Sequence, residues 1–228
     1  VYNLMFKITE KDGRKIILYG EQNRDFCLIQ PTDASDEEKL SSLLQNLSAF
    51  TDKTFCYRRV NIPDWNGEMS PWPAPAVFGD KDFSGEAKAT LEYIENLVPY
   101  LKSEFNLSDN TKFILGGYSL AGLFSLWRGY ESRIFSGIRG ASPSVWFPDW
   151  DKFTDKNINA DYVYLSLGDR ERKTKNKTMC KVRERIEMQK EKLVKQGVPC
   201  TLEYNPGNHF KDADIRTAKA FARVINNL

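Results

Sequence analysis

Histidine and cysteine are scarce in this sequence, which has one histidine and four cysteines among 228 residues. Zinc sites of hydrolases commonly use several histidines, so a single imidazole argues against a catalytic metal. The cysteines, Cys27, Cys56, Cys180 and Cys200, lie far apart and form no C-x-x-C pair, as a zinc ribbon or a thioredoxin motif would require. We therefore expect structural thiols rather than disulfides, no metal site and no cofactor.

Excess charge of one sign and long apolar runs are also lacking. The 33 Lys and Arg residues nearly balance 31 Asp and Glu, and a formal charge of +2 gives no general attraction for nucleic acid or an anionic membrane. No segment approaches the roughly 20 apolar residues that span a bilayer, and residues 1–15 are polar and alternating, unlike a signal peptide. We expect no nucleic-acid or membrane partner and a cytoplasmic protein, with secretion left open because the first residue is Val1 rather than Met.

The remaining composition describes an ordinary globular chain. Hydrophobic residues make up 41% of it and aromatic residues 13%, which is enough apolar area to build a core. The length suits one domain covering residues 1–228. In the first half, turn signals and apolar periods predict strands at 2–9, 15–19, 26–30 and 54–62, a helix over 35–47 with Asp36, Glu37 and Glu38 in its first turn, and a long loop over 63–83.

Helices and strands alternate in the rest of the chain. Ser84 is expected to cap an amphipathic helix ending near Leu101, which Pro99 should kink or divide. After it we predict strands at 112–116, 162–167 and 201–205 and helices at 120–130 and 212–228. The helix 212–228 should turn Ile215, Ala218, Ala222 and Ile225 inward. A further helix carries Met179, Val182, Ile186 and Leu193 on one face and stops at Gly197. This alternation predicts an α/β fold with a mostly parallel central sheet and helices on both faces.

Residues 112–127, KFILGGYSLAGLFSLW, place Ser119 between a buried strand and a helix. Gly117 and Ala121 flank it at the spacing of the nucleophile elbow G-x-S-x-G, with alanine in place of the last glycine. Small residues are needed because this tight turn brings the positions two before and two after the serine together. Ser119 can also be read as a simple helix cap, but its context favours a nucleophile, with the N–H of Leu120 as an oxyanion donor.

A serine hydroxyl needs a base to take its proton, and His209 is the only imidazole available. It follows the last predicted strand, in the chain order Ser, acid, His of α/β-hydrolases. The acid should follow the preceding strand, where Glu171 is favoured and Asp169 is the alternative. Both can also belong to the charge-rich run 169–177, and we read the wider basic segment 170–195 as a solvated face rather than an anion site.

Five segments resemble the esterase D/enterochelin esterase branch of α/β-hydrolases, which also includes feruloyl and acetyl-xylan esterases and mycolyltransferases. They are WNGEMSPWPAP (65–75), GGYSLAG (116–122), ASPSVW (141–146), SLGDRE (166–171) and PGNHF (206–210). The resemblance implies an α/β-hydrolase fold, and the chain length leaves no room for a large lid. Tyr118 stands where members close to esterase D carry histidine, which argues against a glutathione thioester as substrate.

The resemblance also implies roles for individual residues. Ser119 would be the nucleophile, Glu171 the acid and His209 the base. Leu120 N–H would supply one oxyanion donor, and the loop after the strand 26–30 would supply the second, near Ala34 or Ser35.

Aromatic residues are the candidates for substrate contact. Trp65, in the loop 63–83, and Trp146, after the strand that follows the elbow helix, could stack on a planar or sugar substrate or serve as core residues. We therefore predict a serine esterase that acts through an acyl-enzyme on a short-chain, feruloyl-type, siderophore or acetylated-sugar ester. An acyltransferase with the same triad and a non-catalytic binding protein of this fold are the alternatives.

Overall fold

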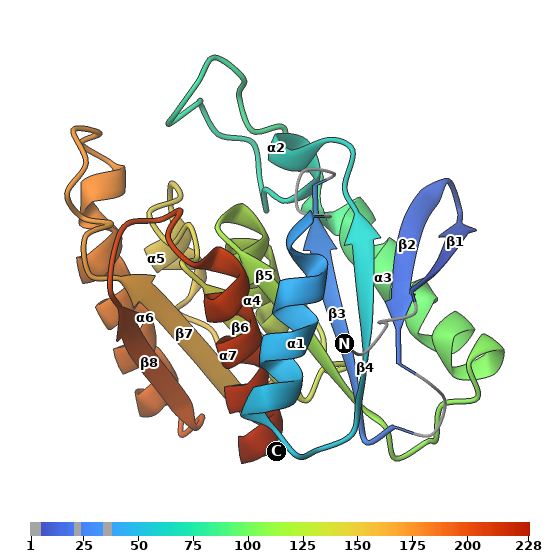
Figure 1. The fold of residues 1–228 in the computed structure, drawn as a ribbon. Coiled ribbons are helices and arrows are strands. Elements are labelled where there is room, and N and C mark those ends of the chain that lie inside the picture. Colours follow the sequence, from blue (N-terminus) through green and yellow to red (C-terminus); the bar gives the residue numbers. More distant parts are fainter. Residues whose placement is uncertain (1–5, 21–23, 34–37) are drawn as a thin grey trace.

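The computed structural model describes residues 6–20, 24–33 and 38–228, and within them eight strands form one sheet (Figure 1). The strands lie in the order β1-β2-β4-β3-β5-β6-β7-β8. Their bounds are β1 Lys7–Lys11, β2 Arg14–Tyr19, β3 Phe26–Thr32, β4 Phe55–Asn61, β5 Lys112–Tyr118, β6 Gly137–Ala141, β7 Tyr162–Gly168 and β8 Cys200–Asn205. From β4 to β8 neighbouring strands are parallel, whereas β2 pairs antiparallel with β1 and β4. The predicted mostly parallel sheet is confirmed.

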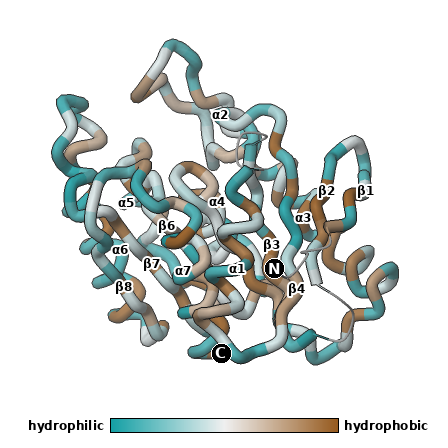
Figure 2. The backbone as a smooth tube through the Cα atoms, in the orientation of Figure 1, coloured by the Kyte–Doolittle hydropathy of each residue, from teal (hydrophilic) through white to brown (hydrophobic). Residues whose placement is uncertain are grey.

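Helices cover both faces of this sheet (Figure 1). The helical segments are α1 Leu40–Phe50, α2 Trp65–Glu68, α3 Ala87–Glu104, α4 Leu120–Glu131, α5 Trp150–Phe153, the 3₁₀ turn η2 Met179–Lys181, α6 Val182–Lys195 and α7 Ala213–Asn227. The apolar sides of α1 and α7 share one hydrophobic core, and those of α3, α4 and α6 lie in the other. In Figure 2 the strands between these layers carry hydrophobic segments, while several outer loops are hydrophilic. Each face of the sheet is thus buried, as β-α-β units require.

The start of α3 differs from the prediction. The helix begins at Ala87, and the Ser84 hydroxyl donates to the Glu86 carboxylate at 2.9 Å instead of capping the helix. A side-chain cap is unnecessary because backbone carbonyls of the preceding loop accept the first N–H groups, Glu86 to Gly67 at 2.9 Å and Ala87 to Ser70 at 3.1 Å. The helix is also continuous through Pro99, so the expected division does not occur.

Two other expectations are corrected. Helix α1 begins at Leu40, and Glu38 lies in the 3₁₀ turn of Glu38 and Lys39 that leads directly into it, rather than in the α-helix itself. Asp36 and Glu37 lie outside the described residues. On α7, Ile215 is 40% exposed, and Arg216 is buried with only 3% exposure. The loop 63–83 contains the short helix α2, for which the sequence shows no apolar period.

The described ranges contain no helix that is both long and apolar enough to cross a bilayer. They also contain no group of three or more His, Cys, Asp or Glu side chains placed to hold a metal ion. All four cysteines are free thiols, and Cys27 and Cys56 are buried partners on β3 and β4. Open α/β sheets bind ligands at the carboxyl ends of their parallel strands.

Candidate active site

Ser119 forms the turn between the end of β5 and the start of α4. Its backbone has φ 57° and ψ −122°, a conformation that is strained for a residue with a Cβ. At Gly117 an added Cβ would lie 2.0 Å from the carbonyl oxygen of Ala121. Only glycine fits there, so the steric reason behind the predicted elbow is present in the structure.

Neighbouring backbone holds this strained turn in place. Ser119 N–H donates to the carbonyl of Ala141, at the end of β6, at 3.0 Å. The Ser119 carbonyl accepts from Leu123 N–H and from Ser144 N–H, each at 3.1 Å. Leu120 is the first residue of α4, so its N–H has no carbonyl partner within the helix. That N–H is therefore available at the positive end of the helix dipole.

The structure brings His209 together with Glu171 rather than with Asp169. His209 Nδ1 lies 2.8 Å from Glu171 Oε2, and the Glu171 side chain is only 5% exposed. Asp169 is exposed and its Oδ1 accepts from Gly207 N–H at 2.8 Å. Both carboxylates follow β7, but only one is directed at the imidazole.

Three further donors hold the other oxygen of Glu171. Its Oε1 accepts from Gly168 N–H at 2.6 Å, from the Ser142 hydroxyl at 2.5 Å and from Arg216 Nη2 at 2.9 Å. Burial by itself would raise the pKa of Glu171, but the hydrogen bond and charge of His209, with Ser142 and Arg216, outweigh burial and lower it to about 2. The carboxylate is therefore ionised at neutral pH.

Arg216 and Ser142 are absent from the sequence-based site. Ser142 lies in the ASPSVW segment and has a positive φ of 44°, which is uncommon for a residue other than glycine, asparagine or aspartate. Arg216 lies on α7 and also donates to Ser142. No clear signal in the sequence points to Arg216, because the predicted inward stripe of α7 runs through Ile215 instead, and only the structure shows the arginine buried.

Tyr118 fixes the backbone of the histidine loop. Its hydroxyl donates to the His209 carbonyl at 2.7 Å, and the two rings meet edge to face with centroids 5.3 Å apart. The His209 side chain keeps 26% of its surface exposed. The imidazole is thus held by Glu171 at one nitrogen and anchored through its backbone, while the rest of the ring faces the cavities.

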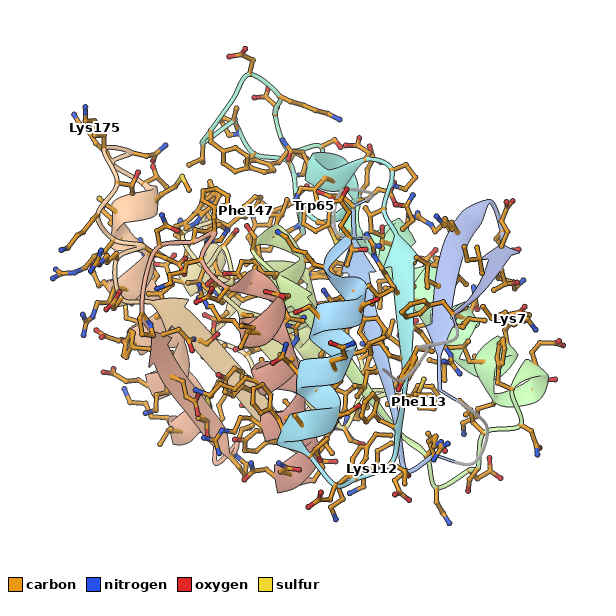
Figure 3. All side chains as sticks on the ribbon, in the orientation of Figure 1. Lys7, Trp65, Lys112, Phe113, Phe147 and Lys175 are labelled. Carbon is orange, nitrogen blue, oxygen red and sulfur yellow. The ribbon has the colours of Figure 1, made fainter. Side chains whose placement is uncertain are left out.

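Two cavities meet at Ser119 and His209. One, of about 440 Å³, is bordered by aromatic and apolar groups, Trp65, Phe78, Trp146, Met179 and Val182, and by Arg170 and Lys173. The other, of about 310 Å³, has a more polar border that includes Gln30, Thr32, Asp33 and Lys39. Trp65 borders both, whereas Trp146 borders the first alone and is 8% exposed. Figure 3 shows Trp65 beyond the carboxyl ends of the strands.

The expected second oxyanion donor, Ala34 or Ser35, lies outside the described residues. Thr32 ends β3, and it borders the polar cavity together with Asp33. Asp33, the last described residue before that segment, borders the same cavity as Ser119.

No family model and no curated protein matches this chain. Solved structures match over nearly its full length. An IroE-like serine hydrolase from Shewanella oneidensis has 16% identity and a TM-score of 0.77, covering 97% of this chain and 79% of that one. Siderophore hydrolase EstA from Aspergillus nidulans has 16% identity and a TM-score of 0.75, covering 98% and 94%. A ferulic acid esterase has 13% identity and a TM-score of 0.67, covering 99% of both chains.

The chain has the α/β-hydrolase fold. The fold implied by the five sequence segments is thereby confirmed, and the similar structures are hydrolases of the kind that this resemblance named. Ser119 follows β5 and His209 follows β8, and both residues border the two cavities at the carboxyl edge of the sheet.

Proposed function

We propose that the protein is a serine esterase in which Ser119 is the nucleophile, His209 the general base and Glu171 the acid. The observation that carries the proposal is the 2.8 Å contact between His209 and the buried carboxylate of Glu171, beside the cavity onto which Ser119 opens. An ionised acid at Nδ1 favours the tautomer whose Nε2 can accept a proton, and it stabilises the imidazolium that then forms.

The reaction proceeds in two halves. His209 takes the hydroxyl proton of Ser119 as the oxygen attacks the ester carbonyl, and the tetrahedral intermediate then collapses with loss of the alcohol, which receives that proton. The acyl group is left on Ser119. A water molecule, deprotonated by His209, attacks the acyl-enzyme, and the acid product leaves as the proton returns to Ser119. No cofactor is needed for this sequence of steps.

Charge develops on the carbonyl oxygen in both halves, and preorganised N–H groups are the usual means of stabilising it. We assign one such donor to Leu120, the first residue of α4, whose N–H has no carbonyl partner within that helix. The second is assigned to the segment after β3, at Ala34 or Ser35. These donors would stabilise the transition state more than the ground state.

The substrate is proposed to be a small ester. Trp65 and Trp146 border the aromatic cavity and are assigned to substrate contact. Feruloyl-type, siderophore, short-chain and acetylated-sugar esters remain the candidate classes, and two of the similar structures are named as a siderophore hydrolase and a ferulic acid esterase. An acyltransferase would use the same three residues with a hydroxyl acceptor in place of water, and product analysis with an added acceptor distinguishes the two.

A fluorophosphonate probe tests the nucleophile directly. We expect the probe to label Ser119, and labelling should disappear in Ser119→Ala. Hydrolysis of 4-nitrophenyl acetate should fall by roughly 10⁴-fold or more in Ser119→Ala and in His209→Ala, because the members of a triad act as a unit. Unchanged hydrolysis in Ser119→Ala would show that another group carries the reaction. A folded protein that neither reacts with the probe nor cleaves any ester would be a binding protein instead.

A further inference from the structure

The segment 170–181 is the most strongly basic part of the chain. It holds six cations, Arg170, Arg172, Lys173, Lys175, Lys177 and Lys181, and one carboxylate, Glu171. Its formal charge is therefore +5, against +2 for the whole chain, which leaves −3 for all other residues together. A chain with almost balanced charges thus concentrates positive charge in one segment.

This segment forms a wall of the aromatic cavity. Arg170 and Lys173 border the cavity together with Ser119 and His209. Asn176 donates from Nδ2 to the carbonyl of Val77 at 2.6 Å, which ties the segment to the loop 63–83. Figure 1 shows both segments rising beyond the carboxyl edge of the sheet, and Figure 3 places Lys175 at the outer end of the basic one.

The cations of this segment lack carboxylate partners in the part of the chain that the structure describes. Among the described residues, none of the six forms an ion pair with a carboxylate. Glu171 is committed to His209 and Arg216. In α6, by contrast, three of the five cations are paired: Arg183 with Glu187, Arg185 with Asp151 and Lys192 with Asp155. The basic stretch 170–195 therefore has two parts, a partly paired helix and an unpaired segment beside the cavity.

An aromatic contact surface faces these cations. Phe78 and Trp146 meet edge to face with ring centroids 6.0 Å apart, and both border the same cavity as Arg170 and Lys173. Phe78 keeps 44% of its surface exposed although it is a large apolar residue. Apolar rings beside unpaired cations suit a ligand that has both a planar or apolar part and a negative charge.

We propose that the substrate is an anionic ester, bound with its apolar part against Phe78 and Trp146 and its negative group beside Arg170 and Lys173. This inference rests on the proposed esterase function. Lys175, at the outer end of the segment, contributes mainly to the field that draws the anion toward the cavity. Such attraction raises kcat/KM and weakens as salt screens the charges.

Matched ester pairs test the proposal. On the acyl side, mono-4-nitrophenyl glutarate is compared with 4-nitrophenyl valerate; on the alcohol side, 4-acetoxybenzoate is compared with 4-acetoxybenzamide. The measured quantity is the ratio of kcat/KM for the charged member to that for the neutral member, after subtraction of spontaneous hydrolysis. We expect a ratio above one for at least one pair, falling several-fold between about 20 and 500 mM NaCl.

Charge-neutralising variants locate the effect. Arg170→Gln and Lys173→Gln should each lower the ratio by about two- to fivefold, the size expected for one partly solvated charge a few ångströms from the anion. Lys175→Gln should lower it less, and only at low salt. The matched control is Lys195→Gln, which should leave the ratio unchanged. Lys195 is exposed and ends α6, about 20 Å along the helix axis from its first residue, Val182.

Two results would overturn the inference. One is a ratio at or below one for both pairs; the other is an equal response of the ratio to Lys173→Gln and Lys195→Gln. Probe labelling of Ser119 is measured on the same samples. Labelled, active enzyme without charge preference contradicts only the anionic substrate, whereas loss of labelling and of all ester cleavage contradicts the esterase function itself.

Discussion

Replacement of Arg216 by methionine tests whether this cation holds Glu171, the proposed acid, in place. Arg216 Nη2 lies 2.9 Å from Glu171 Oε1, and the two side chains are 3% and 5% exposed. Because neither group reaches bulk water, Arg216→Met leaves the buried carboxylate with His209, Ser142 and Gly168 as its partners. We expect one effect on stability and one on the pH dependence of activity.

The effect on stability follows from the lowered pKa of Glu171. It falls from an ordinary 4.5 to about 2, and at about 1.4 kcal/mol per pH unit the ionised carboxylate contributes about 3 kcal/mol at neutral pH. Since the pKa is lower in the folded state, this contribution is present above pH 4.5 and is lost as the pH falls toward 2. Removing one partner of a buried charge pair costs about 3–5 kcal/mol, so Arg216→Met should lower Tm by roughly 10 °C.

The effect on activity distinguishes positioning from mere stability. With Arg216 absent, a positive charge beside the triad is lost and the negative charge of Glu171 is less compensated. The acid limb of the kcat/KM profile should therefore move to higher pH. Arg216→Lys keeps the charge and should restore most of the profile.

Arg128 supplies the matched control. It is a buried arginine on α4 with 0% side-chain exposure and pairs with Glu95 at 2.9 Å, away from the acid. Arg128→Met should also lower Tm but should leave the acid limb in place. The assay is 4-nitrophenyl acetate hydrolysis from pH 5 to 9, with Tm followed by circular dichroism. An unmoved acid limb in Arg216→Met, or equal movement in both variants, would refute the reasoning.

Three further outcomes follow from the site. Glu171→Gln should lower kcat, measured at saturating ester, more than Asp169→Asn does, because only Glu171 contacts the imidazole. The reverse ranking would identify Asp169 as the acid. Gly117→Ala should abolish activity or folding, because the added Cβ would lie 2.0 Å from the Ala121 carbonyl oxygen. Gly140→Ala should be tolerated, because its added Cβ would meet no atom closer than 3.4 Å. Soluble yield and probe labelling measure both effects. Urea unfolding between pH 6 and 3 should show stability falling below about pH 4.5, and Glu171→Gln should flatten that fall.

The elbow was predictable because its sequence requirements are local. Gly117 and Ala121 meet across a single turn, so the spacing of small residues around Ser119 reports the turn directly. The mostly parallel sheet was predictable for a similar reason, since alternating strands and helices leave few alternatives. In both cases, short-range sterics decide the outcome.

The choice between Glu171 and Asp169 depends on contacts that are distant in the chain. Both residues follow β7 within a few positions, and the turn directs them differently: Gly168 N–H holds Glu171 inward, while Gly207 N–H, on the loop after β8, holds Asp169 outward. Arg216 illustrates the same difficulty. An apolar period favours Ile215 as the inward residue of α7, but a buried carboxylate from another strand stabilises an arginine there instead.

The residue before the nucleophile has a physical role that its identity alone does not reveal. Tyr118 stands where members close to esterase D carry histidine, and in this chain its hydroxyl holds the His209 carbonyl at 2.7 Å. Because the only imidazole of the sequence lies on a loop between β8 and α7, its position depends on contacts made by other elements. Glu171 contacts the ring and Tyr118 holds the backbone, so β5 leads into the strained turn of the proposed nucleophile, Ser119, and supplies the anchor of the proposed base, His209. A tyrosine at this position is therefore compatible with the proposed triad, since its hydroxyl contacts the loop that carries His209.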